Sequence, residues 1–298
     1  MRTRPRIEAM MTRREALAAL GSLAVSTLGL PAVQGDATPP LAPGAPDSPE
    51  RMALIEAFRT RSEGIADKFE ARTHKSDWTM PYRLFTPNAA GRLPLVVYLH
   101  GSGGLGTDNV KQMGLGNIFG TRVWALPENQ KAFPCYVVAP QTDRGWVRYG
   151  DPSPGDSVAR VVPGLGDGAR VAFELIDALA KEFPIDRQRI YLTGQSMGGA
   201  GAWHMLAQRP SVFAAAVICC GSRSLDDPTA ARTPLWSFHG AADDTVPVAV
   251  SRERIAALRK AGGHPLSTEY AGVGHNVWQW AYTEPSLVRW VFAKHRAV

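Results

Sequence analysis

The stretch YLTGQSMGGAGAW, residues 191–203, places a serine between glycines where an apolar run ends and a helical pattern begins. The preceding residues are typical of a buried strand, and a helix is expected from Gly198. A serine at such a junction adopts a strained backbone, and its neighbours two positions away must be small for strand and helix to pack closely. Gly194 and Gly198 meet that need. Ser196 therefore lies either in an ordinary tight turn or at the tip of a nucleophile-bearing corner.

Short apolar runs alternate with helical patterns on both sides of this junction, which predicts an α/β fold: a mainly parallel central sheet with helices on both faces. In such sheets the chemistry collects where strands end and loops begin. Helices are expected within 51–69, over 168–183 and 251–261, and from about 284 to 295. The strand-like runs are LPLVVYLHG, CYVVAPQ, RIYLTG, FAAAVICCG, PLWSFHG and STEYAG.

A serine nucleophile needs a general base, because its hydroxyl reacts poorly near neutral pH, and histidine suits that role. His275 lies in YAGVGHNVW, after the last strand-like run, among glycines that allow the loop to turn back over the sheet end. We predict that His275 is this base. The other six histidines lie outside the sheet-end loops, in a turn, in the helix after Ser196, or in an HG pair where a loop-fixing role is expected: His74, His295, His264, His204, His100 and His239.

An acid must hold the histidine in the correct tautomer. The stretch FHGAADDTVPV supplies Asp243 and Asp244, just past a strand and between Ser196 and His275 in the chain. The order Ser, Asp, His is the one expected for this architecture. Neighbouring residues in a turn point in different directions, so at most one of the two carboxylates faces His275. Spacing alone leaves that choice open.

Two backbone amides are needed to stabilise the oxyanion that acyl transfer creates. The residue after the serine, Met197, is expected to supply one of them. The glycine-rich loop LHGSGGLG can bring a second amide close, from Ser102 or Gly103. A phosphate cradle is the competing interpretation, but the loop has neither G-x-G-x-x-G spacing nor a following Lys-Ser/Thr.

The N-terminal region has the pattern of a targeting segment. MTRRE is followed by the small and apolar ALAALGSLAVSTLGLPAV, and the pair Arg13-Arg14 resembles a twin-arginine export signal. We therefore predict an export signal over 1–35, a proline-rich linker over 36–50 and a catalytic domain over 51–298, with a periplasmic or secreted location. An uncleaved N-terminal anchor is the alternative.

The bulk composition indicates an ordinary globular protein of 298 residues that is 45% hydrophobic. The formal charge is +6, but five arginines within residues 1–35 contribute much of it, and no basic run is interleaved with aromatics, so no nucleic-acid partner is expected. No later segment is long and apolar enough to span a membrane. The three cysteines, expected to be buried thiols, form no disulfide framework: Cys135, Cys219 and Cys220.

Four motifs in the expected order make the chain similar to α/β-hydrolases: VVYLHGSGG, FPIDRQRIYLTGQSMGGAGAW, HGAADDTVP and GVGH. The resemblance runs from about Tyr82 to Arg296 and is to secreted carboxylesterase, phospholipase-like and "predicted peptidase" members, related to polyhydroxybutyrate depolymerases and feruloyl esterases. It implies a serine esterase with a triad and two backbone oxyanion donors: Ser196, Asp243 and His275, with Ser102 and Met197. The same motif selects Asp243 over Asp244.

The resemblance leaves the substrate open, because a shared fold leaves that choice to the pocket. A small-molecule or oligomeric ester is expected, and a serine peptidase of the same fold or a catalytically dead binding module are the alternatives. Serine acyl transfer needs no metal or organic cofactor, and the chain has no H-E-x-x-H, so none is expected. Pocket walls are expected within 107–133 and 143–168, and four tryptophans serve either pocket or packing: Trp124, Trp146, Trp278 and Trp280.

Overall fold

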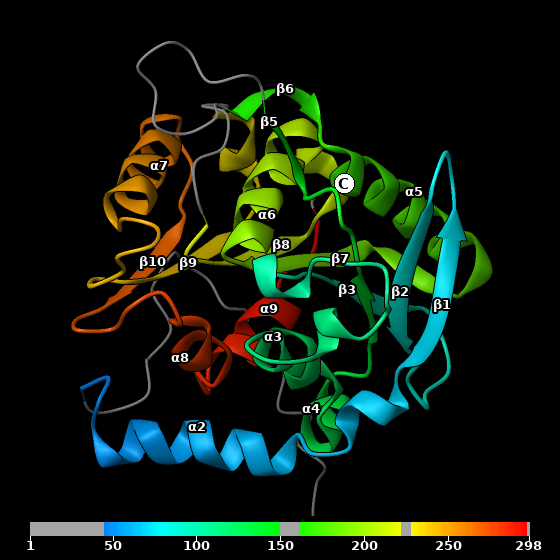
Figure 1. Ribbon diagram of the computed structural model, residues 1–298, viewed down its shortest axis with the longest axis horizontal. Helices are drawn as coiled ribbons and strands as arrows, with labels where there is room; N and C mark the ends of the chain where they lie inside the picture. Colours follow the sequence, from blue (N-terminus) through cyan, green and yellow to red (C-terminus); the bar gives the residue numbers. More distant parts are fainter. Residues whose placement is uncertain (1–44, 150–160, 222–227, 297–298) are drawn as a thin grey trace, which may run out of the picture. The chain divides into compact units, whose positions relative to one another are not determined.

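An eight-stranded sheet in the order β1-β2-β4-β3-β7-β8-β9-β10 organises the part of the chain that the structure describes (Figure 1). This computed structural model describes residues 45–149, 161–221 and 228–296, within the compact unit Asp36–Val298. The strands from β4 to β10 in that order are parallel, and β1 and β2 add an antiparallel edge. Their bounds are β1 Glu70–Lys75, β2 Thr79–Phe85, β3 Leu93–Leu99, β4 Tyr136–Pro140, β7 Ile185–Gln195, β8 Ala215–Cys219, β9 Leu235–Gly240 and β10 Leu266–Tyr270.

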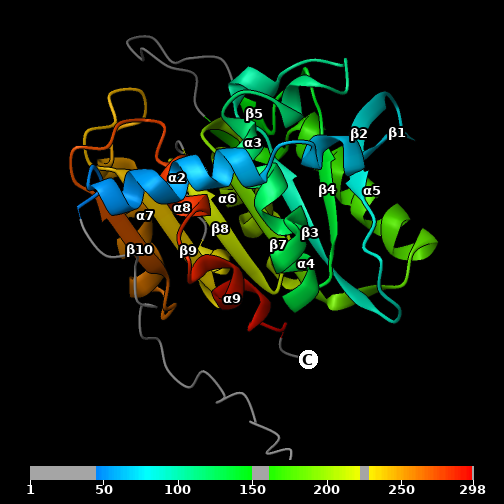
Figure 2. The ribbon, with the colours of Figure 1, turned by 90° about the horizontal axis from the view of Figure 1, so that it is seen from below.

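Helices cover both faces of the sheet (Figures 1 and 2). One face carries α5 (Asp167–Glu182), α6 (Met197–Gln208) and α7 (Ala249–Lys260). The opposite face, nearer the viewer in Figure 2, carries the remaining helices: α2 Pro49–Arg61, α3 Asn117–Arg122, α4 Pro127–Ala132, α8 Trp278–Tyr282 and α9 Leu287–Phe292. A separate antiparallel pair, β5 (Val147–Tyr149) and β6 (Val161–Leu165), lies outside the main sheet.

The apolar runs of the sequence explain this arrangement. Every residue of β3, β4, β8 and β9 is buried, as expected for parallel strands covered on both faces. The apolar stripe of α5, including Val171, Leu175 and Leu179, packs into the core on one side of the sheet. Aromatic side chains such as Phe58, Phe119 and Phe292 fill the other side. The predicted α/β fold with a mainly parallel sheet is confirmed.

All six strand-like runs form strands of the main sheet, and the predicted helices over 168–183 and 251–261 correspond to α5 and α7. At the two ends of the domain, the observed helices and strands differ from those predicted from the sequence. The helix expected from about 284 to 295 is reduced to α9, and the short helix α8 precedes it. Strands β1 and β2 have no continuous apolar run: β1 reads EARTHK, and β2 contains Pro81, which lowers the strand signal.

The cysteines and the lengths of the helices can also be compared with what the sequence predicts. All three cysteines are free and buried, as predicted. Among the described helices, none combines the length and the apolar character that crossing a bilayer requires. The predicted export signal over 1–35 lies outside the described residues, as does most of the proline-rich linker over 36–50.

Candidate active site

Ser196 occupies a strained corner between β7 and α6, with φ 52° and ψ −119°. Such a backbone is rare for a residue with a side chain and indicates a functional constraint. The glycines on either side have no room for a Cβ atom. A Cβ on Gly194 would lie 2.4 Å from the carbonyl oxygen of Gly198, and one on Gly198 would lie 2.0 Å from that of Leu99. The glycines therefore allow β7 and α6 to meet with the half-buried Ser196 at the corner.

The segments that follow β7, β9 and β10 bring Ser196, Asp243 and His275 together. Ser196 Oγ lies 2.8 Å from His275 Nε2, and Asp243 Oδ2 lies 2.8 Å from His275 Nδ1. The ionised carboxylate accepts hydrogen bonds only, so Nδ1 carries the ring proton of a neutral histidine. Nε2 is then a free acceptor for the serine hydroxyl. This arrangement can remove a proton from Ser196 and stabilise the resulting positive ring.

The two neighbouring aspartates have different environments. The Asp243 side chain is fully buried, and its Oδ1 accepts the amide N–H groups of Thr245 and Val246 at 2.9 and 2.8 Å. Asp244 is exposed, and its carboxylate accepts only a long hydrogen bond of 3.3 Å from the hydroxyl of Thr245 among the described contacts. Asp243 is thus the aspartate that faces His275.

The loop after β3 lies directly against Ser196. A Cβ placed on Gly101 would be 3.6 Å from the Cβ of Ser196. The next residue, Ser102, begins the short helix η2 (Ser102–Gly104), and Met197 begins α6. Amides at the first position of a helix precede its first internal hydrogen bond and are free to bind an anion. Ser102 and Met197 therefore lie in the two segments that meet at Ser196.

Two polar side chains, Asn117 and His100, hold this loop. Asn117 Oδ1 accepts the Gly101 amide at 3.1 Å and the Tyr98 hydroxyl at 2.9 Å. His100 Nδ1 donates to the carbonyl of Gly101 at 2.7 Å, and Nε2 accepts the Thr142 amide at 3.2 Å. Burial lowers the pKa of His100 to about 4, because the protonated ring would be desolvated, so the ring is neutral near pH 7. The loop-fixing role expected for His100 agrees with these contacts.

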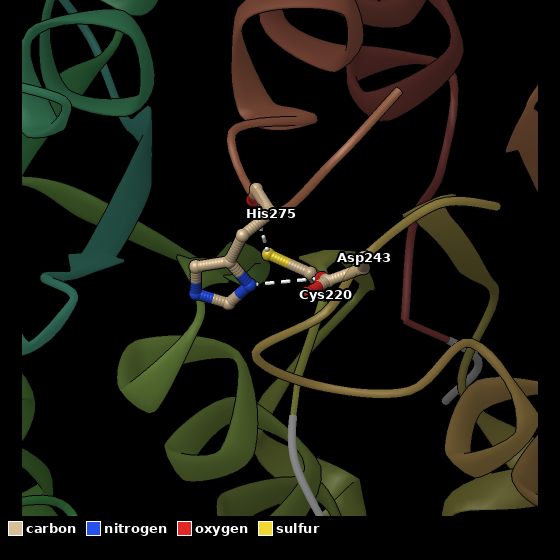
Figure 3. A group of neighbouring side chains, drawn as sticks. All are labelled: Cys220, Asp243 and His275. Atoms are coloured by element: carbon tan, nitrogen blue, oxygen red, sulfur yellow. Dashed lines mark hydrogen bonds and ion pairs between the residues drawn. The ribbon is translucent and has the colours of Figure 1, made fainter. Parts of the chain in front are cut away.

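Cys220 is a neighbour of the site that sequence reasoning did not assign to it (Figure 3). Its buried thiol donates to the backbone oxygen of His275 at 3.3 Å, and its φ of 41° is strained for a residue with a side chain. The possible ligand atoms of Cys220, Asp243 and His275 lie within 4.8 Å of one another. Because each residue already makes a hydrogen bond within the group, its polar atoms are satisfied without an ion. In the sequence, Cys220 was marked only by its place in an apolar run, which predicted a buried thiol and no contact with the site.

The tryptophans divide between packing and the site. Trp124 and Trp146 are fully buried in the core, and Trp280 donates to the backbone oxygen of Pro46 at 2.7 Å. Trp278 lies beside the candidate base, with ring centroids 5.5 Å apart at 88° to the His275 ring. A Cβ on Gly116 would be 3.0 Å from the Trp278 ring, so the backbone at Gly116 lies against this tryptophan. An aromatic ring therefore adjoins His275.

Comparison with known proteins gives a consistent set of similarities. A family model described as phospholipase/carboxylesterase matches residues 89–283. A crystal structure of a thermostable esterase is 34% identical with a TM-score of 0.71 and covers 78% of this chain and 64% of its own. The bifunctional acetylxylan esterase/xylanase of Neocallimastix patriciarum is 36% identical over 74 residues, which are 24% of this chain and 11% of that protein. A ferulic acid esterase from Anaeromyces mucronatus shares the fold, with 15% identity, a TM-score of 0.53, and coverage of 72% of this chain and 87% of its own.

The chain spans less than two thirds of the thermostable esterase and a small part of the acetylxylan esterase/xylanase.

Proposed function

The chain belongs to the phospholipase/carboxylesterase family of α/β-hydrolases, and from that premise we propose that it cleaves carboxylic esters through an acyl-enzyme on Ser196. Asp243 and His275 complete the triad, and the amides of Ser102 and Met197 stabilise the oxyanion. The observation that carries the proposal is the pair of 2.8 Å contacts that join serine, histidine and aspartate in one chain of hydrogen bonds.

The reaction follows from the protonation states in this chain. His275 Nε2 takes the hydroxyl proton as Ser196 Oγ attacks the ester carbonyl, and Asp243 stabilises the charged ring. The two amides hold the negative oxygen of the tetrahedral intermediate. His275 then gives the proton to the departing alcohol, which leaves the acyl group on Ser196. A water molecule, deprotonated by the same histidine, releases the acid and restores the serine.

The substrate that we propose is a small or oligomeric ester. The ring of Trp278 next to His275 supports an apolar or aromatic group near the scissile bond. The segment 107–133, expected as a pocket wall, is described throughout and carries Leu115 and α3. The segment 143–168 lies partly outside the described residues.

Turnover of p-nitrophenyl acetate and butyrate, compared with that of peptide nitroanilides, tests the proposed bond type. The esters are expected to be cleaved and the peptide substrates to remain intact. Ser196→Ala is the matched control and should lose more than about 10³-fold in kcat, as expected for a triad serine. Cleavage of peptides alone would favour a serine peptidase, and failure to label with a fluorophosphonate would favour a binding module without catalytic activity.

We also propose that the protein is exported and that the mature form begins after about residue 35. The support is the sequence of Arg13-Arg14 followed by a small and apolar segment. N-terminal sequencing of exported material should find the shortened chain, and replacing both arginines by lysine should block export. Full-length protein retained in the cytoplasm would contradict the proposal.

A further inference from the structure

A second histidine, His239, also contacts the candidate triad acid, Asp243. His239 belongs to β9, and its side chain is 1% exposed. Its Nε2 lies 3.2 Å from Asp243 Oδ2, the same oxygen that accepts the hydrogen bond of His275. Its Nε2 also lies 2.8 Å from the backbone oxygen of Val246, and its Nδ1 lies 2.6 Å from the hydroxyl of Ser251.

These contacts assign the ring proton. The Val246 carbonyl and the Asp243 carboxylate are both acceptors, so Nε2 must carry a hydrogen to avoid two repulsive contacts. In the neutral ring Nδ1 is then an acceptor, and Ser251, buried near the start of α7, donates its hydroxyl proton to it. The ring thus presents a positive N–H edge to a buried carboxylate.

The same ring ties the acid loop to the sheet. His239 is anchored in β9, whereas Asp243 and Val246 belong to the loop that follows it. The amide of Ala242 donates to the backbone oxygen of Val273 at 2.9 Å, so this loop also rests on the loop that carries His275. A change in the position of Asp243 is therefore transmitted directly to the candidate base.

We propose that His239 is a positioning residue for the reaction: it orients Asp243 and moderates the negative charge that Asp243 presents to His275. The proposal rests on the proposed function of the triad. A donor beside Oδ2 partly neutralises the carboxylate, and its removal strengthens the hold of Asp243 on a protonated His275. Among the described residues, Glu269 of β10 is aligned with His239, and Arg252 holds the Glu269 carboxylate at 2.6 Å.

Two substitutions separate the roles of the ring nitrogens. Glutamine can place its amide nitrogen near the position of Nε2, and asparagine can place one near Nδ1. His239→Gln should retain kcat within about threefold, because it preserves a donor to Val246 and Asp243. His239→Asn should lower kcat by about tenfold with KM nearly unchanged, as expected for the loss of one polar contact to a charged group.

The pH profile of kcat/KM distinguishes positioning from a purely structural role. In His239→Asn the acidic limb should move to higher pH, because an uncompensated Asp243 favours the protonated form of His275. The proposal is overturned if folded His239→Asn keeps the wild-type kcat and profile. It is also overturned if the glutamine and asparagine variants are equally impaired with an unchanged profile.

A measurement on the unmodified protein keeps the proposal testable if a variant does not fold. Two-bond ¹H–¹⁵N correlation spectra near pH 7.5 should show a neutral His239 protonated at Nε2, and protonation at Nδ1 alone would contradict the inference. Failure of the triad itself would appear differently. In that case Ser196→Ala would keep its ester hydrolysis, whatever the result at His239.

Discussion

Replacing Asp243 by asparagine is expected to lower kcat for p-nitrophenyl butyrate by about 10⁴-fold, whereas Asp244→Asn should leave it within about twofold. The two aspartates are adjacent in the chain, and each substitution replaces one carboxylate by an amide. The two variants therefore form a matched comparison. The difference in environment decides the outcome. Asp243 faces His275 at 2.8 Å, and Asp244 is exposed to solvent.

The magnitude follows from the hydrogen bonds of Asp243. An asparagine keeps the Thr245 and Val246 amides only if its oxygen takes the place of Oδ1. Its NH₂ group then faces His275 and donates to Nδ1, so the ring proton moves to Nε2. A ring protonated at Nε2 cannot accept the proton of Ser196. A loss of about 10⁴-fold corresponds to about 5.5 kcal/mol of transition-state stabilisation.

The assay is steady-state hydrolysis by both variants at equal concentration, after circular dichroism has shown that each is folded. Active-site titration with a fluorophosphonate gives the fraction of reactive serine. A greater loss in Asp244→Asn than in Asp243→Asn would refute the assignment. So would an Asp243→Asn variant that keeps more than about a tenth of the wild-type kcat.

Three further predictions concern stability and are checked by urea unfolding. Gly198→Ala should be strongly destabilised or insoluble, because the added Cβ would lie 2.0 Å from the backbone oxygen of Leu99; a wild-type midpoint would contradict the packing described. Arg51→Ala should destabilise the fold by about 3 kcal/mol, because it removes the buried 2.9 Å ion pair between Arg51 and Glu284, and a loss below about 1 kcal/mol would be inconsistent with this. Between pH 6.5 and 4 the fold should lose about 3 kcal/mol as pH falls, because the pKa of His100 is lowered to about 4 and the unfolded chain binds the proton first; His100→Asn should remove this dependence, and an unchanged slope would argue against it.

The central sheet could be predicted from sequence because its parallel strands are continuous apolar runs, as in LPLVVYLHG. The edge strand β1 was not predicted, because EARTHK is polar and its residues remain largely exposed or half-exposed. The short helix α8 also escaped prediction. At five residues, it is too short for a periodic pattern to emerge.

The residues of the candidate site could not all be predicted from the sequence equally well. The glycine spacing around Ser196 reflects a local backbone requirement, so a short motif carries the signal. The choice of Asp243 over Asp244 came from a family resemblance, since their opposite orientations depend on the turn. The contact of Cys220 with the site depends on how separate loops meet, and no spacing in the chain encodes it. The contact of His239 with Asp243 is local, four residues apart in the HGAADDTVP motif, but the spacing alone does not show that the two side chains meet.

Mass spectrometry of the acyl-enzyme tests the central claim most directly. The protein is mixed with p-nitrophenyl butyrate, quenched in acid within the first turnovers, digested and analysed peptide by peptide. The account predicts a butyryl group on the peptide that contains Ser196 and none on that peptide in Ser196→Ala. Active enzyme that carries the acyl group on another residue, or Ser196→Ala that still turns over the ester at the wild-type rate, would contradict it.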